Sequence, residues 1–141
     1  NINVSRFGPK IAGCGGFINI TQTAPVVVYC GTFTAKGLKE TIGNGKLEIV
    51  QEGQIKKFKN EVEQITFAAE YAAQTGQKVM YITERAVFEL LDGVLTLTEI
   101  APGIDLEKDV LAQMEFKPAI AEDLKLMDAR LFTDEKMGLL K

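Results

Sequence analysis

The stretch that constrains the fold most is residues 25–30, where three consecutive valines lie between Pro25 and the pair Tyr29-Cys30. β-Branched side chains favour strands, and an unbroken apolar run indicates a strand that is buried on both faces, as in a parallel sheet. Residues 78–83 have the same character and predict a second buried strand. Two such strands predict an α/β domain, and Cys30 is expected in its core.

Glycine turns predict two β-hairpins. Asp92-Gly93 separates residues 86–91 from residues 94–100, and this dipeptide favours a tight turn between antiparallel strands. Residues 46–51 and 55–59 flank another glycine turn, and they are expected to pair as a polar-faced hairpin at the surface.

Weaker patterns complete the first hundred residues. Short strands are expected at residues 2–4 and 64–67, and the alanine-rich residues 68–75 favour a short helix that ends at Gly76. Residues 17–20 fit either a short strand or the first turn of a helix, because four residues are too few to show a period.

From Pro102 onward the apolar residues follow helical spacing. Asp105 is expected to cap a helix, and a second set of helically spaced apolar residues follows Pro118, namely Ile120, Leu124, Met127 and Leu131. This pattern predicts two amphipathic helices, or one helix and an extended docking arm, and then a frayed tail. We therefore divide the chain into residues 1–117 and a C-terminal helix and tail at residues 118–141.

Composition excludes several classes of function. The chain has 141 residues, enough for one domain, and 16 basic against 19 acidic residues give a net charge of −3, which argues against a nucleic-acid surface. It contains no histidine, and this removes the serine-protease triad and most zinc ligand sets, so we expect no metal site. No stretch approaches the ~20 apolar residues of a membrane helix.

Two further observations concern the setting of the chain. The two cysteines are too few for a disulfide framework, so a reducing, cytoplasmic setting is expected. The chain begins with Asn1 and not with methionine, so we expect it to be a piece of a longer protein.

A glycine-rich turn at residues 12–17 is the first candidate for a ligand site. It is not a dinucleotide fingerprint, because Ile18 stands where that motif needs glycine. Cys14 in this turn is either a nucleophile or a small apolar filler, and the lack of histidine favours the filler. Together with residues 31–37, which follow the first buried strand, the turn predicts a ligand site at the end of a sheet.

Carboxylates are numerous, and each is either an acid–base group or a solvated side chain. Glu99, at the end of an apolar strand, is open to a catalytic role but is better explained as an ion pair or a turn cap; the other candidates are Glu61, Glu63, Glu70 and Glu84.

Four motifs occur together in a fixed order, GGFINI (15–20), VVYCGTFT (27–34), YITERAVF (81–88) and LTEIAPGI (97–104). With them, residues 1–132 resemble the C-terminal part of the family I coenzyme A (CoA) transferases, in particular the long single-chain acetate/propionate and 3-oxoacid branch. The resemblance implies an open three-layer Rossmann-like mixed sheet of the CoA-transferase (NagB/RpiA-like) type, with surface β-hairpins and C-terminal helices. Residues 1–117 would be the C-terminal portion of the glutamate-bearing, beta-type domain.

The resemblance also implies a mechanism. Enzymes of this family move CoA between carboxylic acids by ping-pong chemistry, in which a glutamate attacks acyl-CoA and a glutamyl-CoA thioester forms. The glycines that match Gly15 and Gly16 supply backbone amides to the oxyanion hole. Thr32, Thr34 and Lys36 would line the CoA channel. No cofactor is expected to be bound permanently, because CoA and acyl-CoA are substrates.

One departure limits these expectations. The family's nucleophile lies in a Glu-Ser-Gly or Glu-Asn-Gly setting, and no glutamate here is followed by either pair. We therefore expect these 141 residues to be inactive alone and to act with the missing N-terminal part, on acyl-CoA and short-chain carboxylic acids, in short-chain fatty acid or ketone body metabolism. A homo-oligomer is also expected. The alternative is a non-catalytic CoA-binding or regulatory module.

Overall fold

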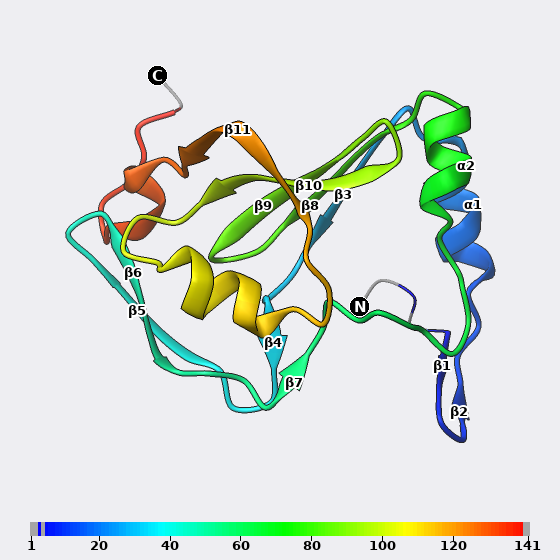
Figure 1. The fold of residues 1–141 in the computed structure, drawn as a ribbon, viewed down its shortest axis with the longest axis horizontal. Coiled ribbons are helices and arrows are strands. Elements are labelled where there is room, and N and C mark those ends of the chain that lie inside the picture. The colour runs from blue at the N-terminus through cyan, green and yellow to red at the C-terminus, as the bar shows by residue number, and fades with distance from the viewer. Residues whose placement is uncertain (1–2, 4, 140–141) are drawn as a thin grey trace.

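A five-stranded mixed sheet forms the centre of the computed structural model, which describes residues 3 and 5–139 (Figure 1). Its strands lie in the order β11 (Ala119–Leu126), β10 (Val94–Ile100), β9 (Ala86–Leu91), β8 (Lys78–Ile82) and β3 (Val26–Cys30). The outer pairs, β11 with β10 and β8 with β3, are parallel, and the two inner pairs are antiparallel. The predicted open mixed α/β sheet is confirmed.

The β9–β10 hairpin forms as predicted around Asp92-Gly93. Both turn residues have positive φ, 50° at Asp92 and 79° at Gly93, which is the backbone conformation of a tight hairpin turn. The strands pair from Val94 with Leu91 to Ile100 with Ala86, and the register shifts between Leu97 and Glu99.

Strands β3 and β8 pair in parallel, as the valine run indicates, but β3 is not buried on both faces. It is the edge strand of the described sheet, and Val26 and Val28 are 52% and 48% exposed. The expectation that Cys30 lies in the core is wrong, because this side chain is exposed at the end of the same edge strand. An apolar run shows that a strand is suited to burial on both faces. Whether it is buried depends on the elements that pack beside it and above it.

Both α-helices pack against one face of the sheet, at the right in Figure 1. Helix α1 (Gly15–Thr23) settles the ambiguity at residues 17–20 in favour of a helix, and Ala24 before Pro25 ends it in an extended conformation. Helix α2 (Ala69–Gln74) forms as predicted, and Gly76 follows it with φ +68°. The contact layer between helices and sheet consists of Phe17, Tyr29, Phe67, Ala72, Val79, Tyr81 and Leu90.

Short strands form three small sheets. These are β1 (Arg6–Phe7) with β2 (Lys10–Ile11), β4 (Thr34–Ala35) with β7 (Ile55–Lys56), and β5 (Lys39–Gly43) with β6 (Lys46–Gln51). The predicted hairpin of residues 46–51 with residues 55–59 is wrong, because each segment pairs with a strand that precedes it in the chain. The turn at Asn44-Gly45 brings β6 onto β5, and the ends of this hairpin bring β4 and β7 together.

Two other strand predictions have different outcomes. Residues 64–67 form bends and not a strand, so that prediction is wrong; two of their amides, on Thr66 and Phe67, donate to the Asn3 side chain. The short strand expected at residues 2–4 lies largely outside the described residues.

The C-terminal segment departs most from expectation. Asp105 caps a helical segment as predicted, and its side chain accepts a hydrogen bond from the Lys108 amide at 2.8 Å. The segment is a short π-helix, η1 (Leu106–Val110), followed by a 3₁₀ helix, η2 (Leu111–Gln113). Of the two alternatives for this segment, the second amphipathic helix is wrong, and one helical segment followed by an extended arm agrees with the structure. Residues 119–126 form strand β11 on the free edge of β10, and only the short 3₁₀ turn η3 (Ala129–Phe132) follows. Apolar residues four apart suit a helix in isolation, yet the open edge of β10 offers hydrogen-bond partners to one side of an extended backbone.

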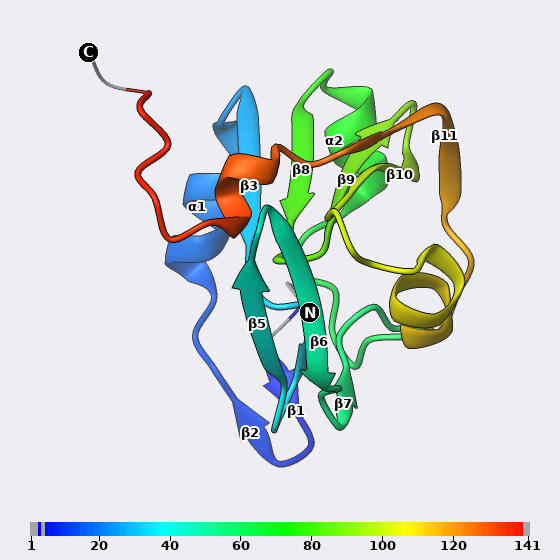
Figure 2. The same cartoon turned by 90° about the vertical axis from the view of Figure 1, so that its left-hand side faces the viewer.

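The main core lies on the side of the sheet nearest the β5–β6 hairpin and the η turns. Phe33, Phe58 and Phe88 form its aromatic centre, with ring centroids 4.8 to 6.2 Å apart. The tip of the hairpin lies against η3, where the Gly45 amide donates to Phe132 O at 3.1 Å (Figure 2). Among the described helices, none has the length and apolar character that crossing a membrane requires.

Candidate functional site

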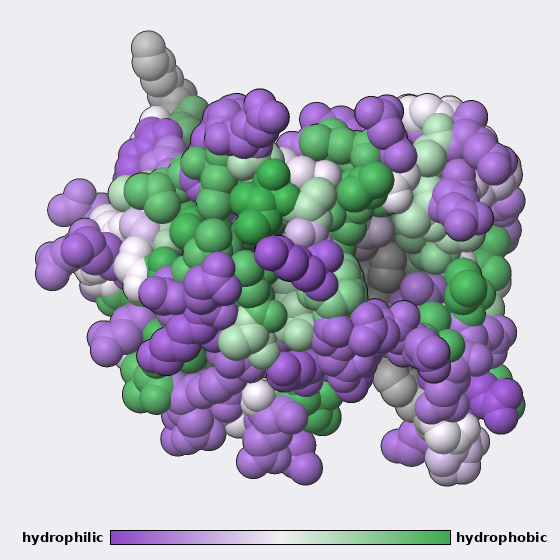
Figure 3. All heavy atoms as spheres, in the orientation of Figure 1, coloured by the Kyte–Doolittle hydropathy of each residue, from purple (hydrophilic) through white to green (hydrophobic). Residues whose placement is uncertain are grey.

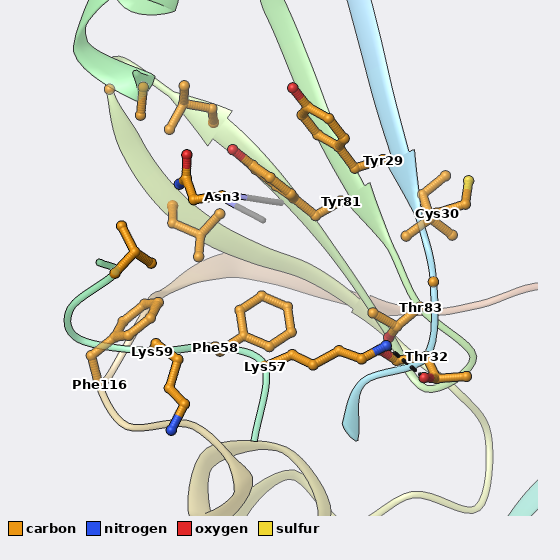
Figure 4. Close-up of a pocket in the computed structure, with 17 residues that line it drawn as sticks. Asn3, Tyr29, Cys30, Thr32, Lys57, Phe58, Lys59, Tyr81, Thr83 and Phe116 are labelled. Atoms are coloured by element: carbon orange, nitrogen blue, oxygen red, sulfur yellow. Dashed lines mark hydrogen bonds between the residues drawn. The ribbon is translucent and has the colours of Figure 1, made fainter. Parts of the chain in front are cut away.

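A pocket of about 380 Å³ opens beside the carboxyl ends of the parallel strands β3 and β8. This is the edge of an open α/β sheet at which ligands usually bind. Gly31 and Thr32 follow β3 there and Thr83 follows β8, while Lys57 and Phe58 come from the segment after β7 (Figure 4). The volume falls within the range of small-molecule sites.

Aromatic rings form much of the pocket wall. Tyr29 and Tyr81 stack with their centroids 5.4 Å apart, and Phe58 and Phe116 line the pocket on the other side (Figure 4). Burial raises the pKa of Tyr29 to about 12 and raises that of Tyr81 as well, so both phenols stay neutral at physiological pH. The aromatic part of the wall is therefore uncharged. On the face of the molecule seen in Figure 3, hydrophobic patches lie between hydrophilic areas.

The polar part of the pocket is a lysine held by a threonine. Lys57 Nζ donates to the backbone carbonyl of Thr32 at 2.8 Å and to its hydroxyl at 2.7 Å. The Thr32 hydroxyl in turn donates to Thr34 O at 2.7 Å. A second lysine that lines the pocket, Lys59, is paired with Glu115.

A buried arginine fixes the segment that carries Thr32. The Arg85 side chain is 0% exposed, and its guanidinium donates to both carboxylate oxygens of Glu52, at 2.6 and 3.1 Å, and to Glu84 at 2.7 Å. It also donates to Asp109 O at 3.1 Å and lies 5.1 Å from the centre of the Phe33 ring. One side chain therefore joins the ends of β6 and β8 to η1.

The two carboxylates connect this arginine to the chain after β3. Glu84 accepts the Phe33 amide at 2.8 Å, and Glu52 accepts the Thr34 hydroxyl and the Gly53 amide. Burial opposes ionisation of Glu52, but its hydrogen bonds from Arg85, Thr34 and Gly53 outweigh burial and lower its pKa. The carboxylates likewise raise the pKa of Arg85 against the effect of its burial, so the Arg85–Glu52 pair is ionised on both sides.

The structure brings one of the predicted CoA-channel residues to the pocket. Thr32 lines it; Thr34 is fully buried and bonded to Glu52, and Lys36 is exposed, with φ 63°, and does not line the pocket. Gly15 and Gly16 are exposed and are the first two residues of α1, directly after Cys14, which is half-buried. They are linked to the pocket through Phe17, whose ring stacks on Tyr29 with the centroids 6.0 Å apart.

Sequence reasoning missed Lys57 and the Arg85 network. Glu84 is named above only as one of several carboxylates, and Lys57 belongs to a short basic run that reads as a solvated surface. Adjacent Glu84-Arg85 after an apolar strand is the one local signal, since charges there need partners if the strand end is buried. No group of three or more potential metal-ligating side chains occurs within residues 3 and 5–139.

No family model matches the chain. The chain is 53% identical over 140 residues to the acetate CoA-transferase YdiF of Escherichia coli O157:H7, and this match covers 99% of the chain and 26% of that enzyme. It is 54% identical over 144 residues to the caffeate CoA-transferase of Acetobacterium woodii, covering 99% of the chain and 27% of that enzyme. The chain thus spans about a quarter of the length of the curated relatives it matches.

Solved structures give the same result for the fold. The chain matches the crystal structure of the acyl-CoA transferase YdiF from E. coli O157:H7 in its thioester complex with CoA, with a TM-score of 0.92 over 97% of the chain and 27% of that structure. The apoenzyme of the same protein matches with a TM-score of 0.93, also at 53% identity. By sequence and by fold, the chain matches the C-terminal part of the family I CoA-transferases.

Proposed function

We propose that this chain acts as part of a longer CoA-transferase that moves CoA from an acyl-CoA to a carboxylic acid. The observation that carries the proposal is the 53% identity over 97% of the chain to an enzyme solved as a thioester complex with CoA. Relatives named for acetate and for caffeate support a carboxylic acid as the acceptor. Within that group we propose short-chain acids.

The nucleophile of the proposed reaction lies outside these 141 residues. In the ping-pong route a glutamate carboxylate attacks the acyl-CoA carbonyl and displaces the CoA thiolate, which gives an acyl-glutamyl anhydride. The thiolate then attacks the glutamyl carbonyl and displaces the free acid, which leaves a glutamyl-CoA thioester. The acceptor acid reverses these steps. No glutamate of this chain is followed by Ser-Gly or Asn-Gly, which supports a nucleophile contributed by another part of the protein.

The proposed contribution of this chain to the chemistry is an oxyanion hole at the start of α1. Gly15 and Gly16 lie in the first turn, where backbone amides have no carbonyl partner within the helix. A Cβ built on either glycine would meet no atom of another segment within 4 Å, so no other part of the described chain packs on this face of the turn. Amides aimed at developing negative charge stabilise the transition states of acyl transfer.

The experiment uses the complete enzyme that contains this chain. Acyl-CoA is added without an acceptor, the thioester is trapped with hydroxylamine, and the modified peptide is identified by mass spectrometry. We expect ping-pong initial-rate kinetics and a modified glutamate outside residues 1–141. Sequential kinetics, or a modified glutamate within these residues, would contradict the mechanism, and CoA binding without any transfer would favour a non-catalytic CoA-binding module.

A further inference from the structure

We propose that Lys57 is the anion-binding group of the pocket, and that it holds the negatively charged group of a ligand whose apolar part enters between the aromatic side chains. The inference rests on the proposed function in one respect, because that function supplies the ligands. A carboxylic acid and CoA both combine an anionic group with an apolar or neutral body. The carboxylate of the acid and a phosphate of CoA are therefore the two sources of the anion.

Lys57 carries a positive charge that no acidic side chain of the described residues balances by an ion pair. Both of its recorded hydrogen bonds go to neutral oxygens, and both oxygens belong to Thr32. Among the described residues, no acidic side chain forms an ion pair with it, whereas the neighbouring Lys59 is paired with Glu115. An ammonium has three N–H donors, so the charge and one donor of Lys57 remain for a ligand.

A ligand can reach the Lys57 ammonium from the side of Gly31. Gly31 lies beside it, and a Cβ at position 31 would be 4.0 Å from Lys57 Nζ. The backbone of Gly31 does not have the positive φ that calls for glycine. The missing side chain therefore leaves one side of the ammonium uncovered, at the carboxyl edge of the parallel strands.

The Lys57 ammonium is held in a fixed position by Thr32. Thr32 is bonded to Thr34 O, and the Phe33 amide between them is bonded to Glu84, which is itself bonded to the buried Arg85. Lys57 is thus tied to a segment that a charged network holds in place. A pre-positioned donor binds a ligand at a lower entropic cost than a free surface lysine.

The side chains that surround Lys57 in the pocket are suited to an apolar ligand body. The side chain next to Lys57 is Phe58, and Phe116, Tyr81 and Leu95 also line the same pocket of about 380 Å³ (Figure 4). In the close-up the Lys57 side chain runs past Phe58 to the Thr32 oxygens. A cation at the mouth and apolar rings inside select a ligand with an anionic end and an apolar body.

The test measures binding and kinetics in the complete enzyme with Lys57→Met, which removes the charge but keeps most of the stem. Equilibrium dissociation constants for CoA and for the free acid are measured by calorimetry, and KM is measured for acyl-CoA and for the acceptor. We expect the affinity for one of the two ligands to fall about 10-fold or more, as for the loss of a hydrogen bond to a charged group. Lys57→Arg is expected to restore most of it, because it keeps the charge.

Further arms identify the anion. A weaker affinity for the acid alone assigns Lys57 to the carboxylate. A weaker affinity for CoA assigns it to a phosphate, and repeating the measurement with dephospho-CoA shows whether that is the 3′-phosphate. The matched control is Lys78→Met, which removes an exposed lysine at the opposite end of β8 and is expected to change neither affinity.

Dissociation constants and KM values within twofold of wild type in Lys57→Met would overturn the proposal, as would an equal loss in Lys78→Met. If Lys57→Met does not fold, Lys57→Gln takes its place, because it also removes the charge but keeps a polar end for the Thr32 oxygens, and a loss of affinity for the same ligand is expected. If Lys57→Met weakens the binding of CoA or acid but the wild-type enzyme transfers no CoA, the anion site is supported. The proposed function is then contradicted.

Discussion

At the scale of single residues, Arg85 explains most of the local order around the pocket. It is fully buried, and its partners come from segments that are distant in sequence, Glu52 after β6 and the Asp109 carbonyl in η1. A buried ion network contributes little net stability when intact, but removing one partner leaves a charge without compensation. The main role of Arg85 is therefore to hold its neighbouring segments in position.

Replacing Arg85 with methionine is expected to lower the free energy of unfolding by about 3 kcal/mol, because the partly buried carboxylates of Glu52 and Glu84 would lose their cation. Urea unfolding followed by circular dichroism measures this change. Arg130→Met is the matched control, since Arg130 pairs with Asp128 at an exposed site and its loss should change the midpoint little. Equal losses in the two variants would contradict the role given to Arg85.

The pH dependence of stability gives a second test of the network. The pKa of Glu52 is lowered in the folded chain, so its contribution is present above about pH 4.5 and is lost as the pH falls through the folded-state value. Glu40 acts in the opposite direction, because burial and the nearby Glu84 raise its pKa. We expect Glu52→Gln to flatten the fall in the urea midpoint between pH 6 and 3, and Glu40→Gln to steepen it. The reverse order would contradict these ionisation states.

Gly16 allows the oxyanion proposal to be separated from stability. Gly16→Ala in the complete enzyme is expected to keep or raise the melting temperature, because alanine favours a helix and meets no atom within 4 Å. The methyl group would crowd the thioester carbonyl, and kcat should fall about 100-fold, as for the loss of an oxyanion donor. Gly43→Ala in β5 is the control, also without a contact within 4 Å. Unchanged kcat in Gly16→Ala would argue against an oxyanion at this turn.

At the scale of elements, the β5–β6 hairpin is docked on the sheet through backbone contacts. The Leu47 amide donates to Pro102 O at 2.8 Å, and a Cβ on Gly103 would lie 2.6 Å from Leu47 O. Gly103 also has φ +92°. The close approach of the hairpin to the end of β10 therefore requires glycine at this position.

Gly103→Ala is expected to destabilise the fold by about 3 kcal/mol, through a collision between backbones and through the left-handed conformation. Gly76→Ala separates the two causes, because Gly76 has φ +68° but no atom within 4 Å of an added Cβ. It should cost about 1 kcal/mol. Urea unfolding of both variants measures the difference, and equal costs would show that the hairpin contact contributes nothing.

The same scale explains which elements the sequence can predict. The β9–β10 hairpin and α2 depend on local signals, Asp92-Gly93 and the alanines before Gly76, and both form as expected. Strand β11 and the pairing of β6 with β5 depend on partners that a periodicity does not identify. Ile120 and Leu124 are spaced for a helix, yet the free edge of β10 draws their segment into the sheet.

At the scale of the whole molecule, the candidate site is only partly predictable for a related reason. A ligand site after the first buried strand follows from the sequence, because loops at that edge of a sheet bind ligands, and Thr32 does line the pocket. Lys57 reaches the pocket from the segment after β7, and Arg85 joins three segments. Contacts between residues so far apart in the chain arise from the fold, and apart from the adjacent Glu84-Arg85 pair the sequence gives no signal for them.

The central claim is that this chain supplies part of a CoA-transferase site but not its nucleophile. The most direct measurement incubates the purified 141-residue chain and, in parallel, the complete enzyme with acetyl-CoA and propionate, and follows the formation of propionyl-CoA. We predict turnover by the complete enzyme and none by the chain. Propionyl-CoA formed by the chain alone, at a rate above the reaction without protein, would contradict the claim.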